Sequence, residues 1–374
     1  MEDNSEMQRR SQAKMRTRKP WIDAARVPFR DNALMIDPPS CTAADFKKPR
    51  LRRCPFDPAE LRFEARLGGG LDGYVWKVYF GDEGPFALKV VSLVQAGSTR
   101  EICIVLFVGL SCSHPAYQFW DNEPPEFAHY YAPQRECQNA ALLQMMETAM
   151  ERAAAASRPI QVIGNPFYWD DALDNQAAFS DEARLKPPSP SQQESDPALG
   201  PDSNAGAPLR PVTAIPRMRK CYGWLALHSD ALWGFPWWLR PPVLKVSKVT
   251  RCILPDREYT AIVYEYVDEG ENDAETVQEA LNFFWLAGFG RTLSPLAKNW
   301  KSGLLVDLCD IIPPRGYGWH GQRYNPISAA VLVQTLAGPD EHDPVIAFRP
   351  RHLPPRPNPH QPSVQAPHRR APPS

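Results

Sequence analysis

The sequence predicts an α+β fold in which an antiparallel sheet carries one long helix and a shortened second part follows. Three observations support this fold class. A glycine-rich turn separates two stretches of strand-forming residues, 61–66 and 74–80. A mostly apolar strand at 85–91 follows and contains a single lysine, Lys89. Residues 133–156 then repeat apolar side chains at helical spacing, with a proline at the first position.

The glycine-rich turn matches the pattern G-x-G-x-x-G-x-V through Gly68, Gly70, Gly73 and Val75, and the strand carrying Lys89 follows it. Protein kinases use these two motifs in this order in the small lobe. Glycines at such offsets let a hairpin backbone approach phosphate groups without Cβ clashes. Val75 would then cover a nucleotide base, and Lys89 would neutralise phosphate charge. A glycine-rich hairpin that binds no ligand is the alternative.

The helix supplies a candidate partner for the lysine. Glu136 comes 47 positions after Lys89, a longer gap than kinases usually show, which indicates an insertion within 92–130. The segment 98–116 is either such an insertion or a retained intron. One hypothesis for Glu136 is an ion pair with Lys89. The other is a carboxylate placed near a helix start because the helix dipole favours it there.

After this helix, residues 220–227 and 259–267 predict a strand pair, and 274–288 predict an amphipathic helix. The second strand ends in Glu265-Tyr266-Val267, which is similar to a kinase hinge. In a hinge, the backbone groups of Glu265 and Val267 would meet an adenine edge. An ordinary strand that leads into an acidic turn is the alternative interpretation.

The catalytic motifs of a kinase are incomplete. Asn299 and Asp307 are candidate metal ligands, but Ser294 stands where the catalytic aspartate is expected, and serine cannot accept that proton at neutral pH. No His-x-Asp triplet occurs between 270 and 310. Too few residues follow 312 to build a full large lobe. The sequence therefore predicts a degenerate kinase-like fold with a truncated large lobe, and it assigns no catalytic residue.

Composition divides the chain further. The chain has 41 prolines, and two proline-rich clusters, at 187–216 and 350–374, lack periodic apolar residues, which predicts disorder there. The expected organisation is the following: a disordered basic tail at 1–55, the small-lobe part at 56–185, a disordered Pro/Ser-rich linker at 186–214, the remainder of the domain at 215–335, and a disordered Pro-rich tail at 336–374.

Charge and cysteine content narrow the function classes. The formal net charge of −1 argues against bulk electrostatic binding of nucleic acid. The basic runs at 9–19 and 47–53 predict a nuclear-import signal, a weak contact with DNA backbone, or simply a solvated tail. The eight scattered cysteines include no C-x-x-C pair and are expected to be reduced thiols of an intracellular protein. No apolar run is long enough to span a membrane.

Several blocks, taken in order, resemble one protein family. They are Phe86-Ala87-Leu88-Lys89-Val90, Glu136-Cys137, Cys221-Tyr222-Gly223-Trp224, 261–266, the F-F-W-L-A-G-F block at 283–289 and the N-W-x-x-G-x-L-V-D block that leads from Asn299 to Asp307. The chain resembles the fungal inner-kinetochore subunit family of the Sim-four complex, Fta-two type, from about residue 56 to 314. Leu308-Cys309 departs from the Phe or His and Ser that the relatives tend to carry.

The resemblance implies a nuclear, centromere-associated scaffold in chromosome segregation, with a kinase-like fold, degenerate catalytic machinery and other kinetochore subunits as partners. The leading hypothesis is a non-catalytic interaction module. An active phosphotransferase that uses ATP and Mg²⁺ stays open, as does a scaffold that binds ATP without turnover. The missing His-x-Asp triplet counts most against phosphotransfer.

Overall fold

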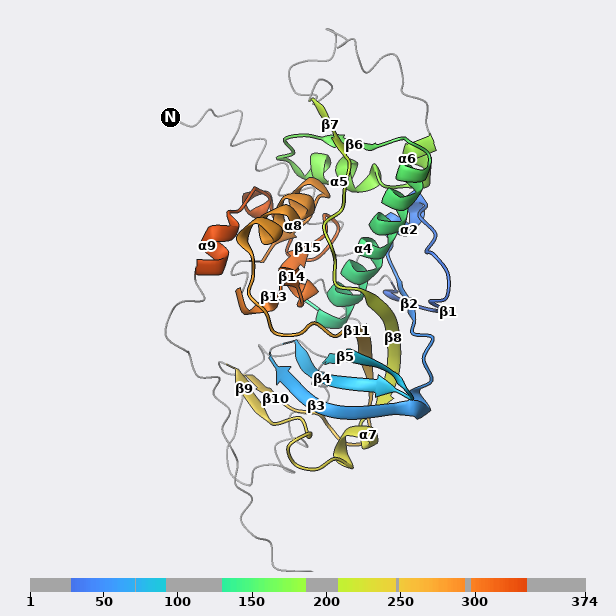
Figure 1. Cartoon of the computed structure of the whole chain (residues 1–374), viewed down its shortest axis with the longest axis vertical. Coiled ribbons are helices and arrows are strands. Elements are labelled where there is room, and N and C mark those ends of the chain that lie inside the picture. The colour runs from blue at the N-terminus through green and yellow to red at the C-terminus, as the bar shows by residue number, and fades with distance from the viewer. Residues whose placement is uncertain are drawn as a thin grey trace, which may run out of the picture. The chain divides into compact units, whose positions relative to one another are not determined.

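The computed structural model describes residues 28–70, 72–91, 130–185, 208–246, 249–292 and 297–334. All of them belong to the first of two units into which the chain divides, Met1–Glu341 and His342–Ser374. The described part combines one large mixed sheet with a small number of helices, so the predicted α+β class is confirmed. Figure 1 shows these elements along the chain.

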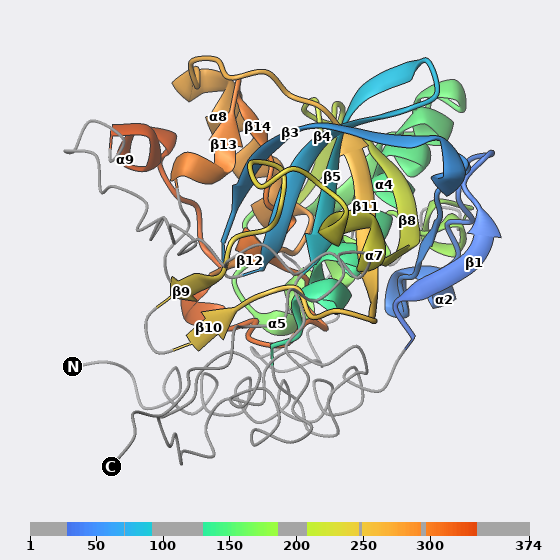
Figure 2. The same ribbon diagram turned by 90° about the horizontal axis from the view of Figure 1, so that it is seen from below.

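A seven-stranded sheet organises the described part of the chain. Its strands, in spatial order, are β1 (Arg30–Leu34), β2 (Leu51–Arg53), β8 (Cys221–His228), β11 (Glu258–Glu265), β5 (Glu83–Val91), β4 (Gly73–Phe80) and β3 (Leu61–Gly69). The five strands from β8 to β3 pair antiparallel and lie side by side in Figure 2. β1 and β2 are instead joined to β8 by parallel pairing. The antiparallel sheet predicted from the glycine-rich hairpin is therefore present, with a parallel extension that was not predicted.

The long helix α4 (Ala132–Ala155) agrees to within one residue at each end with the helix that the sequence predicts at 133–156. Pro133 lies in its first turn, where a missing N–H costs no helical hydrogen bond. The helix is buried on most of its surface, because it packs against β2 and β8 and against the 3₁₀ helix η4 (Leu308–Asp310). This double contact places the start of α4 between the sheet and the later part of the chain.

Shorter elements complete the described region. The helices are α2 (Ala43–Lys47), α5 (Trp169–Ala177), α6 (Asp181–Leu185), α7 (Asp230–Trp233), α8 (Ala274–Leu286) and α9 (Ala329–Gln334). Small two-stranded sheets pair β6 (Ile160–Ile163) with β7 (Leu209–Val212), β9 (Leu244–Val246) with β10 (Val249–Arg251), β12 (Gly290–Arg291) with β15 (Ile311–Ile312), and β13 (Trp300–Lys301) with β14 (Leu304–Leu305). Three further 3₁₀ turns are η1 (Pro58–Glu60), η3 (Ala297–Asn299) and η5 (Gly321–Arg323).

The prediction of disorder throughout 1–55 is wrong for residues 28–55, which form β1, α2 and β2. Leu51 in β2 is fully buried, and Arg52 is held by a salt bridge to Asp37 with 2.6 Å between Nη1 and Oδ1. The basic run at 47–53 is thus partly built into the sheet instead of forming a free tail. Burial of the apolar residues between the charges overrides the tail-like composition.

One other expected boundary can be compared with the structure, the end of the linker at 186–214. The predicted linker at 186–214 ends earlier, because β7 begins at Leu209 and pairs with β6. The remainder of that linker, the tail after 334, the basic run at 9–19 and the segments 92–129 and 98–116 lie outside the described residues.

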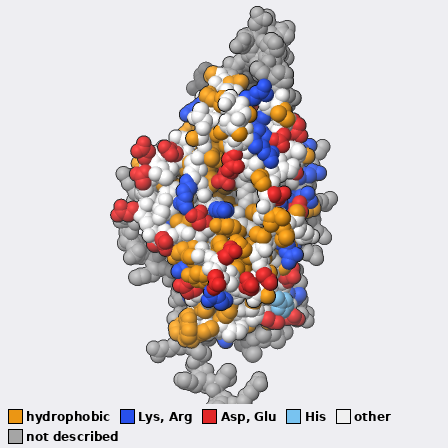
Figure 3. Space-filling model, turned by 45° about the vertical axis from the view of Figure 1, so that its right-hand side comes forward, with side chains coloured by type: hydrophobic (Ala, Val, Ile, Leu, Met, Phe, Trp, Pro, Cys, Tyr) orange, Lys and Arg blue, Asp and Glu red, His pale blue; other side chains and the backbone are white. Residues whose placement is uncertain are grey.

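The surface carries both signs of charge. On the face in Figure 3, acidic and basic side chains are interspersed, which agrees with the formal net charge of −1. Within the described ranges, Cys41, Cys54, Cys137, Cys221, Cys252 and Cys309 are free thiols. None of the helices among the described residues is long and apolar enough to cross a membrane.

Candidate functional site

Lys89 lies at the centre of a buried ionic cluster. It sits on β5, directly opposite Val75 of β4 and Ile262 of β11, and its side chain is 6% exposed. Its Nζ atom lies 3.0 Å from Oε2 of Glu136 and 2.8 Å from Oδ1 of Asp307. Burial alone would lower the pKa of Lys89, but the carboxylates of Asp307 and Glu136 outweigh it and hold the pKa well above its ordinary value. Lys89 is therefore a permanent cation here.

Glu136 is the fully buried member of the cluster. Its Oε2 atom meets Lys89 and also accepts a hydrogen bond from Sγ of Cys309 at 3.0 Å. Its Oε1 atom accepts a hydrogen bond from the hydroxyl of Tyr264 at 2.9 Å. The predicted pair of Lys89 and Glu136 is present, and a simple dipole role at the helix start does not account for these contacts.

Asp307 connects the cluster to the later part of the chain. Its side chain caps η4 by accepting a hydrogen bond from the Cys309 backbone N–H at 3.0 Å. Burial acts to raise the pKa of Asp307, but Lys89 and the Cys309 N–H together lower it below its ordinary value. Asn139 of α4 fixes the same turn, because its Nδ2 group donates to the carbonyl oxygens of Leu308 at 2.7 Å and Ile311 at 2.9 Å.

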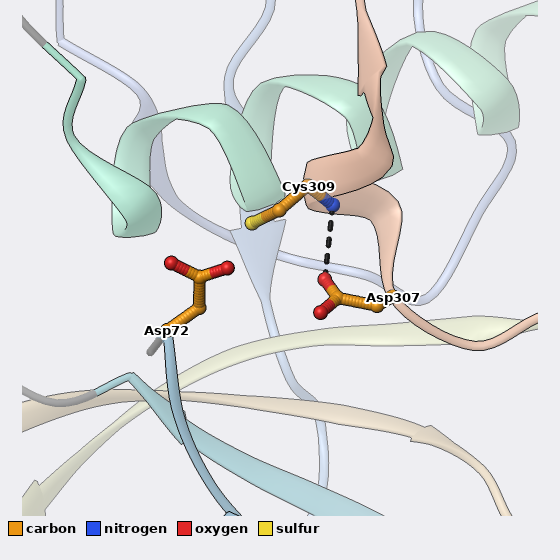
Figure 4. Close-up of side chains that lie close together, drawn as sticks. All are labelled: Asp72, Asp307 and Cys309. Atoms are coloured by element: carbon orange, nitrogen blue, oxygen red, sulfur yellow. Dashed lines mark hydrogen bonds between the residues drawn. The ribbon is translucent and has the colours of Figure 1, made fainter. Parts of the chain in front are cut away.

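A third carboxylate, which the sequence reasoning missed, comes from the glycine-rich turn. Figure 4 shows Asp72 reaching toward Asp307 and Cys309, and the potential ligand atoms of these three residues all lie within 4.8 Å of one another. The hydroxyl of Tyr130 donates to Oδ1 of Asp72 at 2.8 Å. Burial, together with the nearby Asp307 carboxylate, raises the pKa of Asp72. Asp72 lies between two motif glycines, but this pattern alone does not show where its carboxyl group points.

Glu265, the first residue of the predicted hinge, binds other residues of the chain through both its backbone and its side chain. The Glu265 backbone N–H donates to the Lys220 carbonyl at 2.8 Å, and the Glu265 carbonyl accepts from Nε of Arg219 at 3.0 Å. The Glu265 side chain forms an ion pair with Arg217 and accepts from the Lys220 N–H. Val267 lies two residues beyond β11 and is half-buried. These contacts favour the ordinary strand end over an adenine-binding edge.

Arg219 is a second residue that the sequence reasoning missed. Besides the Glu265 carbonyl it donates to the Val306 carbonyl at 2.7 Å, and its guanidinium lies 4.5 Å from the centroid of the Tyr264 ring. It therefore joins the end of β11 to the residue before Asp307. It lies in a short run of basic and apolar residues, so no local pattern distinguished it from its neighbours.

The three motif glycines have different structural roles. Gly73 has φ +152°, and a Cβ there would lie 2.3 Å from the Val90 carbonyl oxygen. Its identity is therefore required by the close approach of β4 to β5. Gly68 and Gly70 are exposed, and a Cβ at either position would meet no atom within 4 Å. The structure gives no steric reason for these two glycines.

Asn299, the first of the two predicted metal ligands, ends η3, and Asp307, the second, directly precedes η4. The Nδ2 group of Asn299 donates to Oδ2 of Asp310 at 3.0 Å, so the structure gives Asn299 a partner other than Asp307. Cys309 does not suit Mg²⁺, which prefers oxygen ligands. Its thiol also donates to Glu136, and burial raises its pKa well above the ordinary value. The neighbouring carboxylates of Asp72 and Asp307, in contrast, offer the oxygen ligands that Mg²⁺ prefers. Ser294 lies outside the described residues.

As it stands, the cluster has a structural role. The buried cation Lys89 lies between the carboxylates of Glu136 and Asp307 and so connects β5, α4 and η4. Comparison of the chain with models of protein families, with curated proteins and with solved structures finds no match.

Proposed function

We propose that this protein is a non-catalytic, kinase-like structural subunit of a fungal inner-kinetochore complex, which acts in chromosome segregation as a protein-interaction module. One observation carries the proposal: Lys89, Glu136 and Asp307 meet in one buried cluster. Protein kinases join a strand lysine to a helix glutamate in the same manner, and a later aspartate completes their site. Here these groups are bound to one another and to the fold.

Two further contacts support a role without phosphoryl transfer. Asp72, from the glycine-rich turn, brings a third carboxyl group close to Asp307, which itself holds Lys89. Arg219 uses the Glu265 carbonyl, which would otherwise be offered to an adenine edge. The phosphate groups of a nucleoside triphosphate would therefore meet the Asp72 carboxyl group. Its adenine would meet a Glu265 carbonyl that already accepts a hydrogen bond from Arg219.

The kinetochore assignment depends on the resemblance of the sequence blocks, and the structure supports a structural use of their residues. Phe283 and Phe284 of the F-F-W-L-A-G-F block are buried in the main hydrophobic core. Gly288 of the same block has φ +91°, and a Cβ there would lie 2.3 Å from the Ala172 carbonyl oxygen. Residues that specify a shape in this way suit a scaffold, whose partners would be other kinetochore subunits.

The expected location is the nucleus, at the centromere. Because the run at 47–53 is partly built into the sheet, we propose that the run at 9–19 supplies most of the import signal. A weak contact between this run and DNA backbone would be a secondary role.

The test uses the full chain with a fluorescent tag in a fungal cell whose centromeric nucleosomes carry a second colour. Coincident nuclear foci, together with co-purification of known inner-kinetochore subunits, would support the proposal. A uniform cytoplasmic signal without such partners would refute the kinetochore part. In parallel, phosphotransfer from labelled ATP is measured for the wild type and for Asp307→Asn. Activity that disappears in the variant would refute the non-catalytic part.

One observation favours a second candidate function, the binding of ATP without turnover. Gly68 and Gly70 are not required by packing, whereas a backbone that approaches phosphate groups would require them. Equilibrium binding of ATP to the wild type, compared with Gly68→Ala and Gly70→Ala, tests this. Binding that both substitutions weaken would support it, and no binding to the wild type would exclude it.

A further inference from the structure

Asp72 and Tyr130 connect the glycine-rich turn to the start of α4. Tyr130 lies two residues before the helix, and its hydroxyl donates to Oδ1 of Asp72 at 2.8 Å. Tyr130 is itself held in place, because the guanidinium of Arg135 lies 4.3 Å from the centroid of its ring. Arg135 also donates to the carbonyl oxygens of Cys309 and Tyr317. The hydrogen bond to Asp72 therefore originates from a fixed side chain.

The position of Asp72 is electrostatically unfavourable for an ionised carboxylate. A carboxylate oxygen of Asp72 lies within 4.8 Å of one on Asp307, in a largely buried environment. Two carboxylates at this separation resist ionising together. Lys89 contacts Glu136 and Asp307 directly, and the Asp72 carboxyl group interacts with the lysine electrostatically without a direct contact of this kind. The Tyr130 hydroxyl stabilises the Asp72 side chain in this inward position.

We propose that Asp72 and Tyr130 form an autoinhibitory latch that keeps phosphate groups away from Lys89. The inference rests on the proposed kinase-like function and adds a mode of regulation to the same site. With the latch closed, the Asp72 carboxyl group is held beside Asp307, where it would crowd a phosphate group that approaches Lys89 and, when ionised, would also repel it. Once Asp72 leaves Tyr130, the exposed part of the Asp307 side chain and the lysine face the glycine-rich turn. The ligand class that fits is a phosphate-bearing molecule, with a nucleoside triphosphate as the larger candidate.

The test is equilibrium binding of Mg²⁺–ATP, and separately of Mg²⁺–tripolyphosphate, to the full chain. Asp72→Ala removes the carboxylate, Tyr130→Phe removes the hydrogen bond that holds it, and Glu64→Ala is the matched control. Glu64 is a carboxylate of the same hairpin that faces solvent and pairs with Lys77. We expect both latch variants to bind ATP roughly tenfold more tightly than the wild type, because the obstructing carboxyl group has been removed or released. The Glu64→Ala protein should bind as the wild type does.

The two probes distinguish the ligand. A gain for both ATP and tripolyphosphate would indicate phosphate recognition alone, and a gain for ATP only would indicate a nucleoside triphosphate; either result supports the latch. An unchanged affinity in Asp72→Ala whose circular dichroism and melting curve match the wild type would overturn it. If Asp72→Ala does not fold, an unchanged affinity in Tyr130→Phe would overturn it equally.

The latch and the proposed function can fail separately. Phosphotransfer by Asp72→Ala would refute the non-catalytic role and leave the latch standing. A lack of binding by every folded variant would refute the latch and leave the interaction module unaffected.

Discussion

Lys89 and Asp307 are 218 positions apart in the chain, and Nζ of the lysine lies 2.8 Å from Oδ1 of the aspartate. Because Glu136 contacts the same amino group, a single side chain joins the sheet, the long helix and η4. Replacement of Lys89 by Met would leave two largely buried carboxylates without their cation. We expect Lys89→Met to lower the free energy of unfolding by about 3–5 kcal/mol.

Urea denaturation followed by circular dichroism measures this change. Lys77→Met is the matched control, because Lys77 forms a solvent-exposed pair with Glu64 and its loss should alter stability little. Equal stabilities of the two variants would show that the buried cluster contributes nothing to folding.

The glycine-rich hairpin allows a comparison within one motif. Gly73→Ala should lower the free energy of unfolding by about 1–3 kcal/mol, because the new Cβ would press on the Val90 carbonyl at a strained φ. Gly70→Ala should leave stability unchanged or raise it by up to about 1 kcal/mol, since the position is open. Chemical denaturation of both variants checks the contrast, and a destabilised Gly70→Ala protein would contradict it.

Asn139 is the buried amide that binds the turn after Asp307 to α4. Asn139→Ala would remove the side-chain donor that the carbonyl oxygens of Leu308 and Ile311 share, although the Ile311 N–H would still reach Leu308. We therefore expect a loss of about 1–3 kcal/mol in unfolding free energy. Asn282→Ala on the exposed side of α8 provides the matched control. A thermal melt of both proteins decides, and a loss of similar size in the control would contradict the assigned role.

Glu147 of α4 should make stability depend on pH. Burial and, to a lesser degree, repulsion by Glu151 raise its pKa to about 7, from an ordinary 4.5. The folded state therefore holds a proton that the unfolded state releases between these values. Stability should fall as the pH rises from about 4.5 to 7, and the decrease should be complete above the folded pKa.

Glu147→Gln removes this dependence. Above pH 7 the variant should be more stable than the wild type by about 1–2 kcal/mol, after allowance for solvent screening of a partly exposed group. Below pH 4.5 the two proteins should be equally stable. Urea titrations at several pH values measure the difference, and parallel pH profiles would refute the assignment.

Local patterns predicted much of the fold. The strand pair around the glycine-rich turn, the strand of Lys89, the long helix and the helix near residue 280 all depend on periodicity within a few residues of one another. The contact between Lys89 and Glu136 was one of two hypotheses for that glutamate, because kinases join a strand lysine to a helix glutamate.

The missed features depend on distant contacts. β2 belongs to the sheet only because it pairs with β8, about 170 positions later, and β1 joins the sheet through β2. The charged sequence around these strands resembles a tail. Arg219 gains its role from two carbonyl groups that the fold brings to it. Asp72 occupies a variable position of its motif, so only the folded arrangement shows that its carboxylate turns inward.

The attachment of β2 to β8 determines where the chain can be cut. The Cys54 N–H donates to the Trp224 carbonyl at 2.8 Å, and a Cβ on Gly223 would lie 2.6 Å from the Arg52 carbonyl oxygen. A fragment that starts at residue 56, the boundary suggested by composition, would lose these contacts and turn an interior strand into an open sheet edge. Such edges pair readily with other chains. Truncation at that point would therefore produce a self-associating protein, whereas a start before Phe29 would keep the edge covered.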